Sequence, residues 1–220
     1  MAKALAMIPF DFNADGNLDV YLTRWSGNAN ILDERDENGA FSSTGLAATT
    51  VNSKDATWVD YDGDGALDLY VANYNQANVL YRNTDESVAA RGLFVRPVDA
   101  NGRTHTGASM GAVVSLFVAG TATRVLGGGA RVIDGGSGYC SQNAYDAYFG
   151  VANVDAAVDI EVRFPCTSVA CGGDPLVVWA RGVVPSALNT GAFGGRRVVE
   201  VERPQTIRYH WALPEGSGTT

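Results

Sequence analysis

Asp11-Phe-Asn-Ala-Asp-Gly-Asn-Leu-Asp19-Val-Tyr-Leu22 returns 49 residues later as Asp60-Tyr-Asp-Gly-Asp-Gly-Ala-Leu-Asp68-Leu-Tyr-Val71. A second match, between Asn30-Ile-Leu and Asn78-Val-Leu, follows at an offset of 48 residues. Two matches at nearly the same offset indicate an internal repeat. A period of about 40–60 residues that contains several short strands is typical of a propeller blade.

Each repeat has the same pattern of strand signals. A short apolar strand is expected before each acidic loop, at 7–10 and 56–59, and an alternating strand after it, at 19–25 and 68–74. Another short strand is expected at 31–32 and 79–80, and residues 36–39 favour a hairpin turn. We therefore predict an all-β protein with two propeller-blade-like repeats in residues 1–89.

The amino-acid composition changes after about residue 90, where aspartate becomes rarer and the strand-like segments are rich in Gly, Val, Ala and Arg. We predict a separate β-sandwich-like or barrel-like domain over 90–205, followed by a tail or contact arm over 206–220. Its expected strands are 92–98, 110–118, 122–127, 157–164, 176–180 and 197–201.

The two acidic loops have the residue types and spacing of a calcium site. Calcium takes six to eight hard oxygen ligands, and aspartates at alternate positions of a tight loop can point their carboxylates inward together. Glycine at the sixth position lets the backbone turn sharply, and the carbonyl oxygen of the seventh residue completes the set. Two Ca²⁺ sites are predicted, with these ligands: Asp11, Asn13, Asp15, Asn17 and Asp19 in the first, and Asp60, Asp62, Asp64, Ala66 and Asp68 in the second.

The second loop has four carboxylates and the first has three, so the count predicts tighter binding by the second loop. Crowded carboxylates repel one another without a cation, which predicts that calcium stabilises each repeat. The helical EF-hand is the competing calcium motif. The strand-like flanks and the lack of Glu at the twelfth position argue against it, and magnesium suits such a multi-carboxylate cage less well.

Composition and charge limit the possible functions. The 220-residue chain is 46% hydrophobic and 18% charged, which is typical of globular proteins. Its net charge of −8 opposes nucleic-acid binding. No apolar stretch approaches the length of a membrane-spanning helix, and the apolar part of the N-terminus is too short for a signal peptide. The abrupt start before the first loop predicts either a mature or trimmed chain or a signal segment that was left out of the sequence.

The cysteines, histidines, glycines and tryptophans have structural explanations. Cys166 and Cys171, five residues apart in a turn-rich segment, favour a local disulfide over two thiols, and Cys140 is expected to be a small buried residue. Neither His105 nor His210 has a catalytic context. Glycines at 127–129 favour a strand bend over a phosphate loop. Residues 135–139 favour a turn that buries Tyr139 over a ligand loop. The tryptophans are expected mainly in the core, with carbohydrate stacking as the alternative: Trp25, Trp58, Trp179 and Trp211.

The stretches Asp60–Tyr74 and Asn78–Asn83 resemble FG-GAP/VCBS repeats, which occur in integrin α-type propellers and in many secreted bacterial proteins. The second region resembles the ASPIC/UnbV domain of the cartilage acidic protein family. The segments that carry this resemblance are Gly107–Val114, Gly135–Gln142, Tyr148–Gly150 and Val158–Pro165. The chain departs from that pattern at Cys140 and at the Cys166–Cys171 insert. The resemblance implies an extracellular, calcium-binding and non-catalytic role in adhesion or matrix.

The expected function is that of a secreted or cell-surface structural protein. Two repeats do not close a propeller, so their open edges predict self-assembly into a homo-oligomer or filament, or docking to another extracellular protein. The alternatives are a carbohydrate-binding module with a glycan ligand and a polysaccharide-acting enzyme with structural calcium. We expect no catalytic residues, because the clustered carboxylates are already explained as metal ligands.

Overall fold

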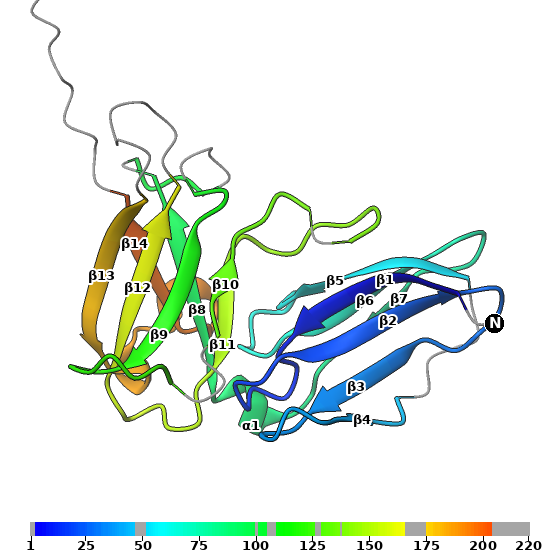
Figure 1. Ribbon diagram of the computed structural model, residues 1–220, viewed down its shortest axis with the longest axis horizontal. Helices are drawn as coiled ribbons and strands as arrows, with labels where there is room; N and C mark the ends of the chain where they lie inside the picture. The colour runs from blue at the N-terminus through cyan, green and yellow to red at the C-terminus, as the bar shows by residue number, and fades with distance from the viewer. Residues whose placement is uncertain are drawn as a thin grey trace, which may run out of the picture.

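The computed structural model describes residues 3–46, 52–99, 101–104, 109–125, 129–136, 138–165 and 175–203. In these ranges the protein is almost entirely β, with four sheets. Two sheets come from the acidic repeats and two form a second unit beside them (Figure 1). The all-β prediction is confirmed.

The first repeat is an antiparallel meander in the order β1-β2-β3-β4. Its strands are β1 (Lys3–Phe10), β2 (Asp19–Trp25), β3 (Ile31–Arg35) and β4 (Phe41–Ser43). The turn predicted at 36–39 joins β3 to β4, with Asp36 Oδ1 accepting from the Asn38 and Ala40 N–H groups. The first acidic loop connects β1 to β2.

The second repeat has the order β5-β6-β7. Its strands are β5 (Ser53–Val59), β6 (Asp68–Asn73) and β7 (Val79–Tyr81). The register shifts between Ala4 and Ala6 in β1 and between Ser53 and Asp55 in β5, which are equivalent positions at an offset of 49 residues. The structural repeat therefore includes this β-bulge as well as the acidic loop.

The Asn30/Asn78 match has a structural cause. Asn30 Oδ1 accepts from the Arg24 N–H at 2.8 Å, and its amide donates to the Tyr21 hydroxyl at 2.9 Å. Asn78 makes the same pair of bonds with the Asn73 N–H, at 2.9 Å, and with the Tyr70 hydroxyl, at 2.7 Å. Each asparagine thus closes the turn that follows the strand after the acidic loop.

The two repeat sheets pack face to face. Phe10 stacks on Trp58, and the ring of Tyr21 meets Trp58 edge-on. At the far end, the Lys54 ammonium lies 3.9 Å from the centroid of the Trp25 ring and 5.0 Å from that of Tyr74. The tryptophan prediction holds for Trp58, which is buried, whereas Trp25 and Trp179 are partly exposed.

A short helix, α1 (Glu86–Ala89), leads from the repeats into the second unit, and Asp85 caps its N-terminus. In the described part of the chain, seven strands follow. These are β8 (Gly92–Val98), β9 (Val113–Val118), β10 (Arg131–Val132), β11 (Ala147–Gly150), β12 (Val158–Phe164), β13 (Leu176–Val183) and β14 (Val198–Glu202). Two short 3₁₀ helices, Pro185–Ala187 and Gly191–Phe193, lie between β13 and β14.

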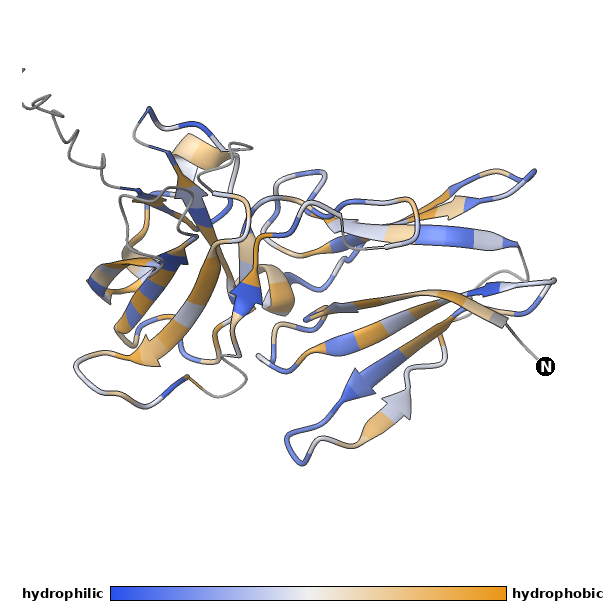
Figure 2. Ribbon diagram, turned by 45° about the horizontal axis from the view of Figure 1, so that its top comes forward, coloured by the Kyte–Doolittle hydropathy of each residue, from blue (hydrophilic) through white to orange (hydrophobic). Residues whose placement is uncertain are grey.

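The second unit is a sandwich of two sheets. One has the order β11-β8-β14, with β14 parallel to β8, and the other is the antiparallel sheet β10-β9-β12-β13. Hydrophobic residues concentrate on the strands (Figure 2), and the space between the sheets is filled by side chains such as Leu93, Leu116, Phe149 and Ile160. The described strands form no closed barrel. Of the two predicted alternatives, sandwich-like and barrel-like, the structure therefore agrees with the sandwich.

Strand β8 takes part in two cores, and for this reason it is buried along nearly its whole length. Leu93 and Val95 face the sandwich interior, whereas Phe94 packs with Tyr148 and Val198 against the core of the repeats. The second unit therefore shares a hydrophobic interface with the repeats.

A buried carboxylate connects two turns of the sandwich. Asp159 accepts from the N–H groups of Gly120 at 3.0 Å and Gly182 at 2.8 Å, and it pairs with Arg181 at 2.8 Å. These hydrogen bonds and the guanidinium hold the pKa of Asp159 down to about 2.

The segment 138–143 corrects two predictions. It leaves the sandwich between β10 and β11 and runs along the edge strand β5 (Figure 1), where the Ser141 hydroxyl donates to Ala56 O at 2.8 Å. Asn143 Oδ1 accepts from the Trp58 N–H. Tyr139 is 64% exposed and Cys140 is exposed, so neither is a core residue. The physical reason is that this segment covers the edge of another sheet and does not fold into its own core.

The remaining strand predictions agree with the structure to within a few residues, with four exceptions. The strand predicted at 122–127 is reduced to a single bridge at Arg124 in its described part, and β4, β10 and β11 were not predicted. Several predicted features lie outside the described residues: the Cys166–Cys171 disulfide, His105, His210, Trp211, most of the glycine run at 127–129 and the tail at 206–220.

Candidate metal-binding loops

Both acidic loops have the same backbone conformation. Gly16 and Gly65, at the sixth position, have φ of 93° and 101°, as the sequence predicted. The fourth position is also left-handed, with φ of 52° at Ala14 and 78° at Gly63, which the sequence analysis missed. A left-handed alanine costs roughly 1 kcal/mol. The loop geometry is therefore kept even where the residue type opposes it.

The first aspartate of each loop binds the loop backbone. Asp11 Oδ2 accepts from the Gly16 N–H at 3.0 Å, and Asp60 Oδ2 accepts from the Gly65 N–H at 3.0 Å. The other carboxylate oxygen accepts from Asp15 N in the first loop and from Gly63 N in the second. Asp11 Oδ1 and both oxygens of Asp60 keep a second lone pair, so these bonds orient the carboxylates and leave each of them able to bind a cation.

The ninth-position aspartate connects the loop to the next turn of the repeat. Asp19 accepts from Phe12 N at 3.0 Å and from Arg35 N at 2.8 Å. Asp68 accepts from the equivalent groups, Tyr61 N at 3.1 Å and Asn83 N at 2.8 Å. Each aspartate thus holds three segments of its repeat together around one carboxylate.

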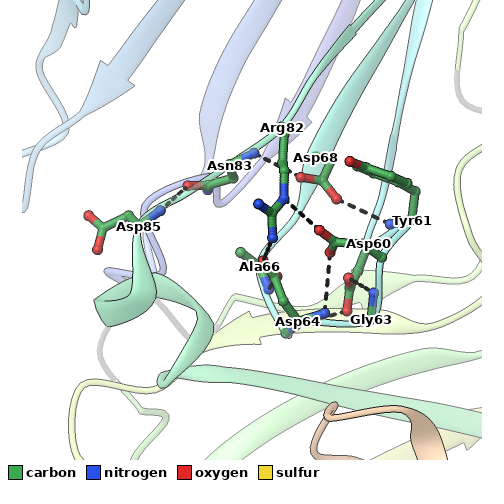
Figure 3. A network of polar contacts seen from close by, with 11 residues as sticks. Asp60, Tyr61, Gly63, Asp64, Ala66, Asp68, Arg82, Asn83 and Asp85 are labelled. Atoms are coloured by element: carbon green, nitrogen blue, oxygen red, sulfur yellow. Dashed lines mark hydrogen bonds and ion pairs between the residues drawn. The ribbon is translucent and has the colours of Figure 1, made fainter.

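The remaining positions complete the loop. Asp15 Oδ1 accepts from Asn17 N at 2.7 Å and Asp64 Oδ1 accepts from Ala66 N at 2.8 Å, so the fifth side chain fixes the seventh residue, whose carbonyl oxygen is the expected ligand. In the second loop, oxygens of Asp60, Asp62 and Asp68 lie within 4.8 Å of one another (Figure 3 shows Asp60 and Asp68).

Burial disfavours the charged form of the aspartates at the first and ninth positions of each loop. Asp11 is 1% exposed, and loss of water raises its pKa to about 6. The same cause raises the pKa of Asp19 to about 7 and raises the pKa values of Asp60 and Asp68. A group of buried oxygen donors with excess negative charge fits a hard divalent cation of the size of calcium.

The two loops lie beside a common cavity. It has a volume of about 330 Å³ and is bordered by Asp11 and Asp60 from the loops and by Trp58, Arg131 and Arg196. Arg196 Nε lies 3.9 Å from Asp60 Oδ2, and the Arg131 guanidinium lowers the pKa of Asp11 against the larger effect of burial. Each first aspartate therefore has one arginine of the second unit near it.

The loops also dock on a pair of glycines in the second unit. Gly92 in β8 and Gly150 in β11 are register partners. A Cβ atom on Gly150 would lie 2.3 Å from the backbone carbon of Ala14, and one on Gly92 would lie 2.1 Å from Gly65 O. The Gly150 N–H also donates to Asp11 Oδ2 at 2.9 Å. Only glycine allows both loops to approach the sheet this closely.

Two further contacts were missed by the sequence analysis. The Asn83 amide donates to Phe12 O at 2.9 Å, which ties the second repeat to the first loop. Arg91 Nη2 donates to Asn13 O at 2.9 Å from beyond the repeats. Neither contact has a signal in the sequence, because Asn83 aligns with Arg35 in the first repeat and Arg91 lies beyond the repeats.

Comparison with known families agrees with this architecture. Residues 11–71, which span both acidic loops, match the family model of the FG-GAP-like repeat. Residues 102–170 match the family model of the ASPIC and UnbV domain. No curated protein matches the chain. Among the residues that the structure describes, no helix is long and apolar enough to cross a membrane.

Proposed function

We propose that this chain, which consists of FG-GAP-like repeats followed by an ASPIC/UnbV domain, is a calcium-binding structural protein of the extracellular adhesion type. The pairing of these domains suggests an adhesion-type repeat protein. The observation that carries the calcium proposal is the repeated set of buried carboxylates, oriented by the same backbone N–H donors in both loops.

The loop residues would hold the ion through their oxygens. Positions one, three, five and nine offer side-chain oxygens, and position seven offers its carbonyl. Calcium, when bound, neutralises the negative charge of the buried carboxylates. Because Asp19 also binds the last residue of β3 and Asp68 also binds the turn after β7, neutralising them stabilises the whole repeat.

Titration with Ca²⁺ by isothermal calorimetry tests this proposal. We expect two bound ions per chain and one in each of Asp15→Asn and Asp64→Asn, which replace partly exposed ligands and spare the core. Asp155→Asn, an exposed aspartate of the sandwich, is the matched control and should keep both. Absence of binding at millimolar Ca²⁺ by folded wild-type protein would refute the proposal.

Each repeat also has one exposed face, and each exposed face is equivalent to a face that is buried where the two repeats pack together. Ala56 is 2% exposed against the first repeat, whereas its equivalent in β1, Met7, is 62% exposed. Tyr21 is fully buried against the second repeat, whereas its equivalent, Tyr70, is 39% exposed. The open face of each repeat thus corresponds to the covered face of the other. Head-to-tail stacking of a second copy would extend the packing that joins the two repeats.

Sedimentation velocity in calcium tests this assembly. Met7→Asp on the open face should lower the association of wild-type protein, and Val132→Asp, an equally exposed apolar position in the sandwich, should not. A wild-type monomer at high protein concentration in calcium would contradict it.

A binding role rather than a catalytic one also follows, because the aspartates with raised pKa are explained as calcium ligands: Asp11, Asp19, Asp60 and Asp68.

A further inference from the structure

We propose that Glu34 and Arg82 make the two calcium sites unequal, so that the first loop binds calcium more tightly despite its smaller number of carboxylates. Arg82 acts as a tethered counter-cation that calcium must displace from the second loop. This inference rests on the proposed calcium function, and it reverses the ranking that the number of loop aspartates predicts.

Glu34 and Arg82 occupy equivalent positions in the two repeats. Each lies four residues after the asparagine that closes its turn, Asn30 or Asn78. Glu34 is in β3, and Arg82 directly follows β7. Strand β7 pairs with β6 in the same register as β3 pairs with β2. One structural position, just outside the expected ligands, therefore has a negative side chain in the first repeat and a positive one in the second.

Both side chains reach the third position of their own loop. Glu34 Oε1 accepts from the Asn13 amide at 2.9 Å. Arg82 Nε donates to Asp62 Oδ2 at 2.6 Å. Its Nη2 lies 3.4 Å from Asp64 Oδ2 (Figure 3 labels Arg82 and Asp64). In the first loop the neighbour orients a ligand and adds a negative charge. In the second loop the neighbour is already bound to two ligands.

The local charges follow from these contacts. Glu34 brings the first loop from three negative charges to four, whereas Arg82 reduces the four of the second loop to a net three. The arginines beside the first aspartates, Arg131 and Arg196, are one to each loop and do not distinguish the sites. Arg91 also brings a positive charge to the first loop, but it binds the Asn13 carbonyl and no expected ligand atom, whereas Arg82 binds two ligand carboxylates.

The consequence for binding differs between the loops. Arg82 holds Oδ2 of Asp62 and Oδ2 of Asp64, so calcium at the second loop must compete with the guanidinium for these two carboxylates. The Arg82 side chain is 52% exposed and can turn into water, which makes displacement feasible but unfavourable. Exposed ion pairs of this kind contribute little to stability, so the expected effect is an affinity lower by roughly three- to tenfold.

Calorimetry on single-site backgrounds tests the proposal. Asp64→Asn leaves the first loop to be measured and Asp15→Asn leaves the second. We expect the first loop to bind Ca²⁺ more tightly. In the second-loop background, Arg82→Gln should tighten binding about three- to tenfold, and in the first-loop background Glu34→Gln should weaken it by a similar factor. Arg124→Gln, which removes an exposed arginine of the sandwich, is the control and should change neither.

A structural role alone would give a different pattern. Without calcium, Arg82→Gln should lower the melting temperature, because four carboxylates lose their counter-charge, while the same variant gains affinity. Glu34→Gln should do the opposite in both measurements. If Arg82→Gln leaves second-loop affinity unchanged or weakens it, or if the second loop is the tighter site, the inference is overturned. If folded wild-type protein binds no Ca²⁺ at all, the proposed function itself fails.

Discussion

Replacing Gly150 by alanine should separate the first acidic loop from the sandwich. The added Cβ would lie 2.3–2.5 Å from three backbone atoms of Ala14, which cannot move aside as a flexible side chain would. The loop or β11 must therefore shift by about 1 Å to restore ordinary contact distances. That shift also lengthens the 2.9 Å hydrogen bond from the Gly150 N–H to Asp11.

The size of the effect follows from these two losses. Overpacking of a well-packed site costs about 1–3 kcal/mol, and loss of a hydrogen bond to a charged group costs about 1.5–3 kcal/mol. Together they predict a loss of roughly 2.5–6 kcal/mol in the free energy of unfolding. For a chain of this length that is a fall of roughly 5–24 °C in melting temperature.

Differential scanning calorimetry in calcium measures this fall. Gly136→Ala is the matched control, because a Cβ there meets its nearest neighbour, Ser141 O, at an ordinary 3.9 Å. We expect the control to melt within about 1–2 °C of the wild type. A folded Gly150→Ala variant that melts together with the control would refute the docking of the loop on this glycine.

Three other predictions concern pH and the core. In calcium-free protein, stability should fall as pH rises from 4 to 8, because folding raises the pKa of Asp11 to about 6 and that of Asp19 to about 7, and a raised pKa stabilises the fold only below it. These pKa rises correspond to losses of about 3 and about 4 kcal/mol in the free energy of unfolding. The combined loss is smaller than their sum, because the two carboxylates repel each other and do not titrate independently. Urea unfolding in chelator should show the fall in stability, and saturating calcium should flatten it. Asp159→Asn should instead weaken the acid dependence between pH 4 and 2, because a pKa held near 2 gives stability that is lost as pH falls, and the acid-unfolding midpoint measures this. Trp58→Ala should cost about 3–5 kcal/mol by opening the core between the repeats, whereas Trp179→Ala, at a partly exposed position, should cost clearly less in the same denaturant titration.

The local features of the fold could be predicted from the sequence. Strand β8 begins and ends where its apolar run does, and the repeated Asp and Gly positions identify both loops and the bend at Gly16 and Gly65. These features depend on nearby residues, and the period of the pattern is enough to find them. The left-handed Ala14 could not be found in this way, because alanine does not favour that conformation.

Contacts between distant segments could not be predicted. Tyr139 has the residue type of a core position, yet it is exposed because its segment lies along β5 and not inside the sandwich. Residues 147–150 of β11 are too short a run to signal a strand, and their place beside β8 depends on the tertiary fold. The opposite charges of Glu34 and Arg82 are visible once the repeats are aligned, but their contacts with the loops come only from the structure.

The number of calcium ions bound per folded chain tests the central claim most directly. Native mass spectrometry of the whole chain, after exchange into millimolar calcium and removal of excess salt, should show two ions on the wild type. It should show one on Asp15→Asn and one on Asp64→Asn, and the double variant should bind none. A wild-type chain that is folded and carries no calcium, or a double variant that still carries two ions, would contradict the assignment of these loops as the calcium sites.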